Sequence, residues 1–186
     1  MSRRRVAVTG MGCVTSLGLE LDQVWKSILA GTSGVGPIES FDASSYATRF
    51  AGQVQDWSAP RLNPREAKRI DRFAQFAINA SADAVADAGL DLSAEDPWRC
   101  GAIIGSGIGG IQEFEEGYRK FYEKGHERVS PFMVPKLMCN AAAGNVSIYF
   151  GVKGPNNAVT TACASGGHAI GQAADCIRYG QADMMI

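Results

Sequence analysis

Thr160-Thr161-Ala162-Cys163-Ala164-Ser165-Gly166-Gly167-His168 is the stretch of sequence that decides the fold. Residues 157–162 favour a β-strand, and residues 163–179 favour a helix built largely from glycine and alanine. Cys163 therefore stands at a junction between a strand and a helix. The free N–H groups at a helix N-terminus carry partial positive charge and favour the thiolate, which is the nucleophilic form of cysteine. This placement makes Cys163 a candidate nucleophile.

Strands and helices alternate along the rest of the chain. Further strands are predicted at residues 5–9, buried on both faces, and at 101–105 and 182–186, with one more possible at 50–54. Helices are predicted at 21–29, 63–88, 110–123 and 137–150, and a loop with two prolines at 129–136. The helix at 63–88 begins with a capping asparagine, a proline and an acid three residues on. This alternation predicts an α/β fold with a largely parallel sheet.

The composition is that of an ordinary globular protein, with 46% hydrophobic and 20% charged residues among 186. This length allows one domain with a substantial core. The net charge of −1 gives no overall attraction to nucleic acid or to an anionic membrane surface. No apolar run reaches the ~18 residues of a membrane span, and Thr9, Gly10 and Gly12 interrupt the residues after the basic start, Met1 to Arg5. We therefore expect a cytoplasmic protein.

Five cysteines, at positions 13, 100, 139, 163 and 176, are scattered and form no C-x-x-C pair. This pattern predicts free thiols in a reducing compartment, and neither a disulfide framework nor a zinc site. We expect no metal and no other cofactor.

Charge is almost absent from a long segment near the C-terminus. Between Leu137 and Ala174 the only charged residue is Lys153. A surface helix needs one polar face, and the small-residue helix after Cys163 lacks one. We infer that this helix is buried between two layers, and that the second layer comes from another chain or from additional sequence.

Two simpler interpretations stay open at this point. Cys163 could be a small buried hydrophobe, because free cysteine is among the most buried residue types.

The second concerns a glycine-rich stretch. Gly105-Ser106-Gly107-Ile108-Gly109-Gly110 matches G-x-G-x-x-G, which is typical of dinucleotide-binding loops. The acidic residue expected about 20 residues later would fall near Ser130, in a predicted loop. Tight turns and close backbone approach explain these glycines better.

Basic residues recur at helical spacing near the start of the helix at 63–88. Such a face is usually solvated, and the functional alternative is a docking patch for an acidic partner, which Arg128 would extend. The residues on this face are Arg61, Arg65, Lys68, Arg69 and Arg72.

Neither histidine is a convincing catalytic base. His168 lies five residues after Cys163, about 1.4 turns along a helix, and is expected to point away from the thiol as a buried, hydrogen-bonded residue. His126 is expected at the surface.

Five motifs make the chain similar to a known family. They are Val6–Gly12, Tyr46–Gly52, Gly105–Gly110, Ser130–Phe132 and Thr161–Gly166. The chain resembles the β-ketoacyl-[acyl carrier protein] synthases, specifically the elongating type II enzymes of the thiolase-like superfamily. This resemblance implies a homodimer in which residues 1–186 are the N-terminal half of an α-β-α-β-α layered sandwich with a mixed sheet. The C-terminal half, with two catalytic histidines, would lie beyond Ile186.

The resemblance also implies a condensing acyltransferase of fatty-acid elongation. Cys163 would accept an acyl group from the thioester of an acyl carrier protein, and its backbone N–H would be one oxyanion donor. Decarboxylation of malonyl-carrier protein would supply the carbanion that forms the 3-oxoacyl product. The positions matching the acyl-chain pocket are Ile108, Phe132 and Met133, and those matching basic contacts to the acidic carrier protein are Arg65, Lys68, Arg69 and Arg128.

Two other functions are weighed against this one. A truncated or split half-protein would serve only as a structural or binding half and would have no activity alone. A nicotinamide oxidoreductase would require dinucleotide binding at Gly105–Gly110. We expect that the 186 residues alone carry out no condensation and expose an apolar face that promotes association.

Overall fold

The computed structural model describes residues 4–186, so the first three residues of the basic start lie outside it. Three parallel strands form the central sheet in the order β4-β3-β5. The middle strand is β3 (Cys100–Gly105), and its neighbours are β4 (Asn156–Val159) and β5 (Met184–Met185). This arrangement confirms the largely parallel sheet that the alternation of elements predicts.

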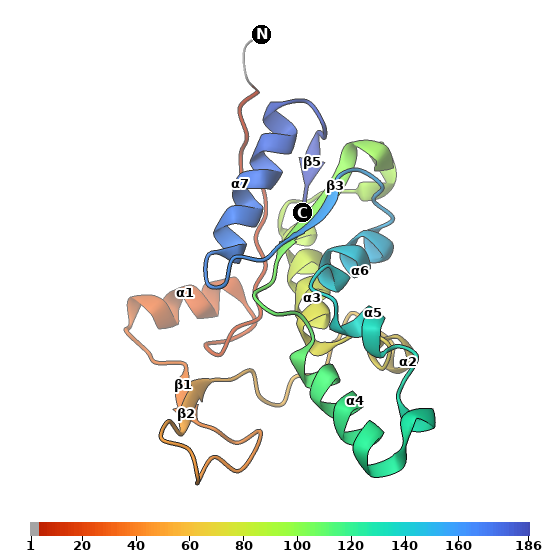
Figure 1. Ribbon diagram of the computed structural model, residues 1–186. Coiled ribbons are helices and arrows are strands. Elements are labelled where there is room, and N and C mark those ends of the chain that lie inside the picture. The colour runs from red at the N-terminus through yellow and green to blue at the C-terminus, as the bar shows by residue number, and fades with distance from the viewer. Residues whose placement is uncertain (1–3) are drawn as a thin grey trace.

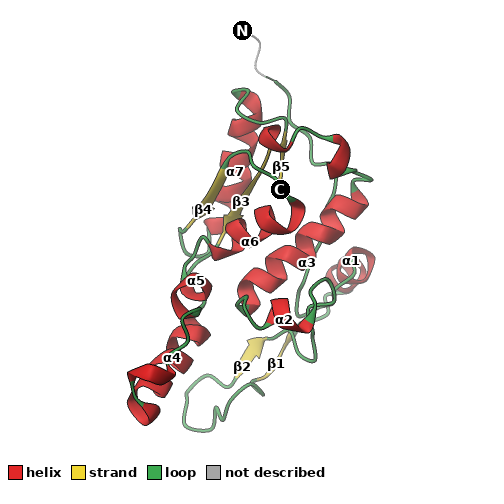
Figure 2. Ribbon diagram, turned by 90° about the vertical axis from the view of Figure 1, so that its right-hand side faces the viewer, coloured by secondary structure: helices red, strands yellow, loops and turns green. Residues whose placement is uncertain are grey.

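Helices cover both faces of the sheet (Figures 1 and 2). On one face, α3 (Arg72–Asp87) packs against α6 (Ala141–Phe150). On the other face lies α7 (Ser165–Arg178), which contacts all three strands. The chain is therefore a three-layer α-β-α unit.

The core divides between these two faces because side chains of a strand alternate in direction. From β3, Ala102 packs with Ile78 of α3 and Val146 of α6. The next residue, Ile103, packs with Ala169 of α7. Each large side chain buried in this way contributes about 1.5–3 kcal/mol relative to leaving it in water.

The remaining elements extend from this unit. In Figure 1, α4 and α5 project from one side of the lower half, and β1 and β2 lie on the other side, where they pair antiparallel. The bounds are α1 (Leu21–Leu29), β1 (Val35–Pro37), β2 (Phe50–Gly52), α2 (Pro64–Ala67), α4 (Ile111–Lys124) and α5 (Met133–Leu137). Single 3-10 turns span 92–94, 97–99 and 126–128.

The predicted buried strand at residues 5–9 is wrong. This segment belongs to no strand, and Val8 is 78% exposed. The residues that follow lie against α3, not in a sheet. A Cβ added at Gly10 would be 2.1 Å from the carbonyl oxygen of Ala84, and one at Gly12 would be 2.0 Å from that of Ala80. The glycines therefore serve close packing on a helix, which alternation of apolar residues does not reveal.

Residues 63–88 form two helices instead of the one predicted. Asn63 caps α2 as expected, and the Glu66 side chain completes the capping box. However, α2 ends after four residues. Asp71 then begins α3, because its carboxylate accepts a hydrogen bond from the N–H of Phe73. Asp71 is a second N-cap signal that lies within a continuous helical pattern.

Three further boundaries differ from the predictions. The loop predicted at 129–136 contains the start of α5, where Pro135 is tolerated because the first helical N–H groups have no intrahelical acceptor. As a result α6 begins at Ala141 and not at residue 137. The last helix begins at Ser165, so Cys163 precedes it.

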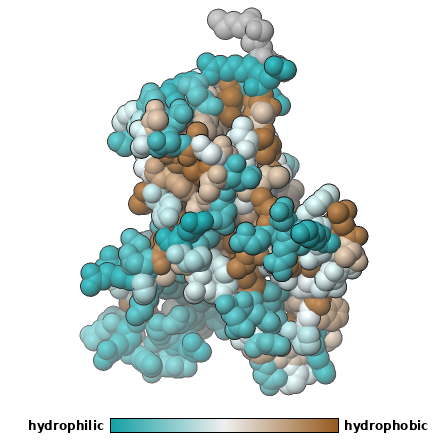
Figure 3. Space-filling model, turned by 180° about the vertical axis from the view of Figure 1, so that it is seen from behind, coloured by the Kyte–Doolittle hydropathy of each residue, from teal (hydrophilic) through white to brown (hydrophobic). Residues whose placement is uncertain are grey.

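The expectation that α7 is buried on all sides is not met by this chain. Only Ser165 and Ala169 of α7 are buried, and Ile170 is 69% exposed. Apolar side chains also reach the surface over a broad area of the rear face (Figure 3). Among residues 4–186, no helix has both the length and the apolar character needed to cross a bilayer.

Candidate active site

Cys163 lies in the tight turn that joins β4 to α7. The preceding residue, Ala162, has a φ of +49°, and only one other non-glycine residue among positions 4–186 has a positive φ. This conformation costs a residue other than glycine about 1–2 kcal/mol. Cys163 is the one exposed cysteine within the described chain. The turn thus holds a thiol at the surface at the expense of local strain.

Ser165 holds this turn together. It is 4% exposed, and its hydroxyl donates a hydrogen bond to the carbonyl oxygen of Ala162 at 2.6 Å. The Ser165 hydroxyl oxygen also accepts a hydrogen bond from the N–H of Thr161 at 2.9 Å. The hydroxyl therefore connects the strand side and the helix side of the turn, on either side of Cys163. Sequence reasoning did not single out Ser165, although a serine near the start of a helix often forms hydrogen bonds with neighbouring backbone groups.

The glycine-rich loop 105–110 lies beside the turn. A Cβ at Gly105 would be 2.4 Å from the carbonyl carbon of Ser165, so only glycine allows this approach of β3 to α7. The N–H of Ser106 donates to the carbonyl of Val159 at 3.0 Å, and its hydroxyl accepts the N–H of Gly109 at 3.0 Å. Close backbone approach therefore accounts for these glycines, as the sequence indicates.

The two histidines have simple environments. His168 is exposed, so its predicted burial is wrong, but it has the expected hydrogen-bond partner, because Nδ1 lies 2.8 Å from the hydroxyl of Thr161. The small, open first turn of α7 leaves this side chain in solvent. His126 is exposed in a 3-10 turn, as expected.

The three apolar residues predicted to bind an acyl chain occupy two places. Ile108 is exposed at the tip of loop 105–110. Phe132 and Met133 lie at the start of α5. The guanidinium of Arg69 is 5.5 Å from the centre of the Phe132 ring, and the sulfur of Met133 packs against Gly117 of α4.

The predicted basic face is not continuous. Arg61 forms an ion pair with Asp83 at 2.6 Å. Arg72 is half-buried, with its guanidinium over the rings of Trp57 and Phe76. Arg72 lies beyond the break between α2 and α3, and the exposed cations before that break are Arg65, Lys68 and Arg69.

A second basic group lies at the far end of α4. Arg128 lines a hollow of about 510 Å³ together with Lys120 and Lys124. The two lysines are four residues apart, a spacing that places them on one face of a helix and is visible in the sequence.

The other thiols differ from Cys163 in their surroundings. Burial raises the pKa of the Cys100 thiol. Burial and the nearby carboxylates of Asp83 and Glu20 raise that of Cys13. Within residues 4–186, no group of three or more His, Cys, Asp or Glu side chains is arranged to hold a metal ion.

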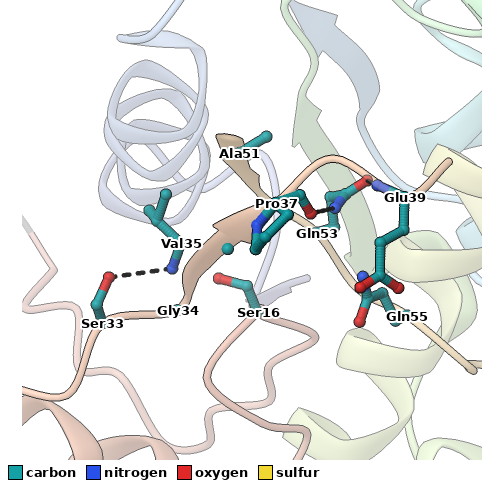
Figure 4. A pocket seen from close by; sticks show the side chains of 10 residues that line it. Ser16, Ser33, Gly34, Val35, Pro37, Glu39, Ala51, Gln53 and Gln55 are labelled. Atoms are coloured by element: carbon teal, nitrogen blue, oxygen red, sulfur yellow. Dashed lines mark hydrogen bonds between the residues drawn. The ribbon is translucent and has the colours of Figure 1, made fainter. Parts of the chain in front are cut away.

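A pocket of about 250 Å³ lies at the β1–β2 pair (Figure 4), and no residue of the Cys163 turn lines it. Its polar side chains hold the local structure together. The amide of Gln53 donates to the carbonyl of Pro37 at 2.9 Å, and the hydroxyl of Ser33 accepts the N–H of Val35 at 3.1 Å. None of the residues that line it is one of the predicted site residues.

Solved structures of ketosynthases share this architecture. An ishigamide ketosynthase/chain length factor matches with a TM-score of 0.85 and 26% identity, over 97% of this chain and 46% of that one. A beta-ketoacyl synthase from Burkholderia phymatum matches with a TM-score of 0.81 and 29% identity, over 98% of this chain and 45% of that one. A chain in the structure of a type II PKS acyl-carrier protein in complex with its ketosynthase shares the fold. It matches with a TM-score of 0.80 and 24% identity, over 97% of this chain and 49% of that one. The fold is that of a thiolase-like ketosynthase.

Sequence comparison identifies the family within this class. Residues 3–186 match the family described as beta-ketoacyl synthase, N-terminal domain, and the chain belongs to it. The 3-oxoacyl-[acyl-carrier-protein] synthase 2 of Vibrio cholerae is 46% identical over the whole chain, and that of Synechocystis is 43% identical. The chain spans 45% of the length of each of these relatives. The resemblance stated from the motifs is confirmed.

Proposed function

We propose that this chain is the thiol-bearing N-terminal half of a condensing acyltransferase that makes 3-oxoacyl-[acyl carrier protein] in fatty-acid elongation. The observation that carries the proposal is the exposed Cys163 in its strained turn, in a chain 46% identical throughout to a 3-oxoacyl-[acyl-carrier-protein] synthase 2. Two catalytic histidines and the second oxyanion donor belong, in this proposal, to a C-terminal half.

The chemistry assigned to Cys163 is acyl transfer. Its sulfur attacks the thioester carbonyl of an acyl carrier protein, a new C–S bond forms, and the carrier thiol leaves with the proton. Malonyl-carrier protein then loses carbon dioxide. Its carbanion attacks the acyl-enzyme, and the Cys163 sulfur leaves. The amides of Gly166 and Gly167, in the first turn of α7, place the positive helix end beside this centre.

The acyl chain and the carrier protein have assigned contacts. Ile108, Phe132 and Met133 offer apolar surface to the acyl chain. A cytoplasmic homodimer completes the proposal, and the outer edge of β4, which has no strand partner among the described residues, supports pairing with a second copy. The exposed cations assigned to the acidic carrier protein are Arg65, Lys68, Arg69 and Arg128.

The test is a chimera in which this chain replaces the matching 45% of the Vibrio cholerae relative. Supplied with acyl- and malonyl-carrier protein, the chimera should form 3-oxoacyl-carrier protein, detected by mass spectrometry. The Cys163→Ala chimera should form neither acyl-enzyme nor product. A folded chimera with the native Cys163 that is never acylated would contradict the proposal.

A second candidate is a half-protein that is inactive alone. The exposed apolar side chains of α6 and α7, which include Ile148 and Ile170, favour it, because a partner half would cover such a surface. Iodoacetamide should alkylate Cys163 in the 186-residue chain, yet the chain should make no 3-oxoacyl product. Measured turnover by the chain alone would refute this candidate.

A further inference from the structure

Three charged side chains meet in the interior, away from the thiol. Asp71 is 9% exposed and Glu113 is 8% exposed. The ammonium of Lys136 forms an ion pair with the Glu113 carboxylate, and the Lys136 side chain is 16% exposed. These residues come from the starts of α3 and α4 and from α5. Burial of charge is costly unless the charges are paired, so a cluster of two carboxylates and one ammonium requires an explanation.

The cluster surrounds the end of the glycine-rich loop. A Cβ at Gly110 would lie 3.0 Å from the carboxyl carbon of Asp71 and 2.6 Å from the backbone carbonyl oxygen of Lys136. The N–H of Gly110 donates to the carbonyl of Leu137 at 3.0 Å. The end of the loop is therefore held between α3 and α5 with no room for a side chain.

The same loop reaches the Cys163 turn at its other end. Gly105 packs directly on Ser165, and the Ser106 hydroxyl accepts the N–H of Gly109. The loop is thus braced internally as well as at both ends. Ile108, one of the residues assigned to the acyl chain, lies between these attachment points.

The cluster also fixes the second part of the acyl-chain surface. Lys136 pairs with Glu113, and Met133, three residues before Lys136, packs on Gly117, four residues after Glu113. Residues three or four apart lie on one face of a helix, so α4 and α5 are joined at two neighbouring points. The position of Met133 therefore depends on the ion pair.

We propose that Lys136 is a positioning residue which, with Glu113 and Asp71, holds loop 105–110 and Met133 in place relative to Cys163 and so controls acyl-chain selectivity. This inference rests on the proposed function. A buried ion pair is a weak source of stability, because an apolar pair of similar volume is often as good. Its contribution here is a fixed arrangement of three helices around one loop.

The test compares variants in the chimera described above. Glu113→Gln combined with Lys136→Met removes both paired charges at similar volume. We expect the ratio of kcat/KM for a long and a short acyl chain to change by about tenfold, because small misplacements of bound groups have large effects on rate. Lys136→Arg, which keeps the charge, should keep the parental ratio. Where the double variant fails to fold, Asp71→Asn, which keeps a capping side chain, should shift the ratio in the same direction.

The matched control lies on the same helix. Glu116 and Lys120 form an exposed ion pair in α4, four residues apart. Glu116→Gln combined with Lys120→Met should leave the selectivity ratio unchanged.

A second measurement separates this inference from the proposed function. In the 186-residue chain, the rate of Cys163 alkylation by iodoacetamide should change in the Glu113→Gln, Lys136→Met variant and not in the control. A parental chimera without product would overturn the proposed function, and the alkylation rates would still decide the positioning role. Parental selectivity and parental alkylation in the folded double variant would overturn the positioning role.

Discussion

At the scale of single residues, the thiol depends on its neighbours in the turn. Cys163 itself makes no contribution to the core, whereas Ser165, two residues later, is buried and joins both sides of the turn with its hydroxyl. Ala162 accepts one of these bonds while it holds a left-handed backbone conformation. The residue with the exposed thiol and the residue that fixes the geometry of its turn are therefore different.

Ser165→Ala should destabilise the protein by about 1–3 kcal/mol, because the N–H of Thr161 loses its acceptor inside the structure. Urea denaturation would measure the change. Ser93→Ala is the matched control, because the Ser93 hydroxyl bonds only to Asp91 at the surface. Equal unfolding midpoints for the Ser165 variant and the parent would show that the hydroxyl does not hold the turn.

Asp71→Asn should change how stability depends on pH. Burial raises the pKa of Asp71, with a further increase from Glu113, while the Phe73 N–H and Lys136 act in the opposite direction. A raised pKa means that the stability contribution of Asp71 is complete below its unfolded pKa and is lost as pH rises through its folded pKa. The free energy of unfolding of the asparagine variant, relative to the parent, should therefore increase with rising pH.

Denaturation at a series of pH values would measure this trend. Asp71→Ala is the control for capping, since it should show the same pH trend with a free energy of unfolding about 1 kcal/mol below that of the asparagine variant at every pH. A difference between the asparagine variant and the parent that does not vary with pH would contradict the assignment.

At the scale of elements, packing decides where helices begin and end. The capping box at Asn63 and the largely parallel sheet follow from local pattern, and both are found. The break before Asp71 does not follow from local pattern, because this residue contacts Gly110 on a distant loop. The helix α5 likewise depends on α4, through Met133. No local pattern in the sequence contains these contacts.

Gly105→Ala tests the contact between β3 and α7. The added Cβ would lie 2.4 Å from backbone atoms of Ser165, which cannot yield as a flexible side chain would. Overpacking of this kind should cost about 3 kcal/mol, measurable as a lower thermal midpoint. Gly144→Ala in α6 meets nothing within 4 Å and should stabilise the protein by about 0.5–1 kcal/mol. Similar midpoints for both variants would contradict this account.

At the scale of the whole molecule, the exposed apolar surface stands out. Trp25 and Leu29 of α1, Ile148 of α6 and Ile170 of α7 are all more than half exposed. Hydrophobic patches lie in the upper half and at the right edge of the face in Figure 3, among hydrophilic surface. Such a surface on a globular unit is typical of an interface that another domain or chain covers.

The 186-residue chain should therefore associate as its concentration rises. Light scattering after size-exclusion chromatography would measure the apparent mass across a dilution series. The chimera that carries the C-terminal part of the Vibrio cholerae relative should give one defined mass over the same range. A chain that stays monomeric at all concentrations would show that the apolar surface needs no cover.

The sequence by itself determined the α/β class, the junction that carries Cys163 and the family, because these depend on local periodicity and short motifs. Tertiary structure alone decided that Cys163 is exposed, that Ser165 is the buried support of its turn, and that residues 5–9 form no strand. It also brought Asp71, Gly110 and Lys136 together across 65 positions of chain. Such contacts depend on how helices and strands pack in three dimensions. Residues far apart in the sequence give no periodic pattern that would reveal their contact.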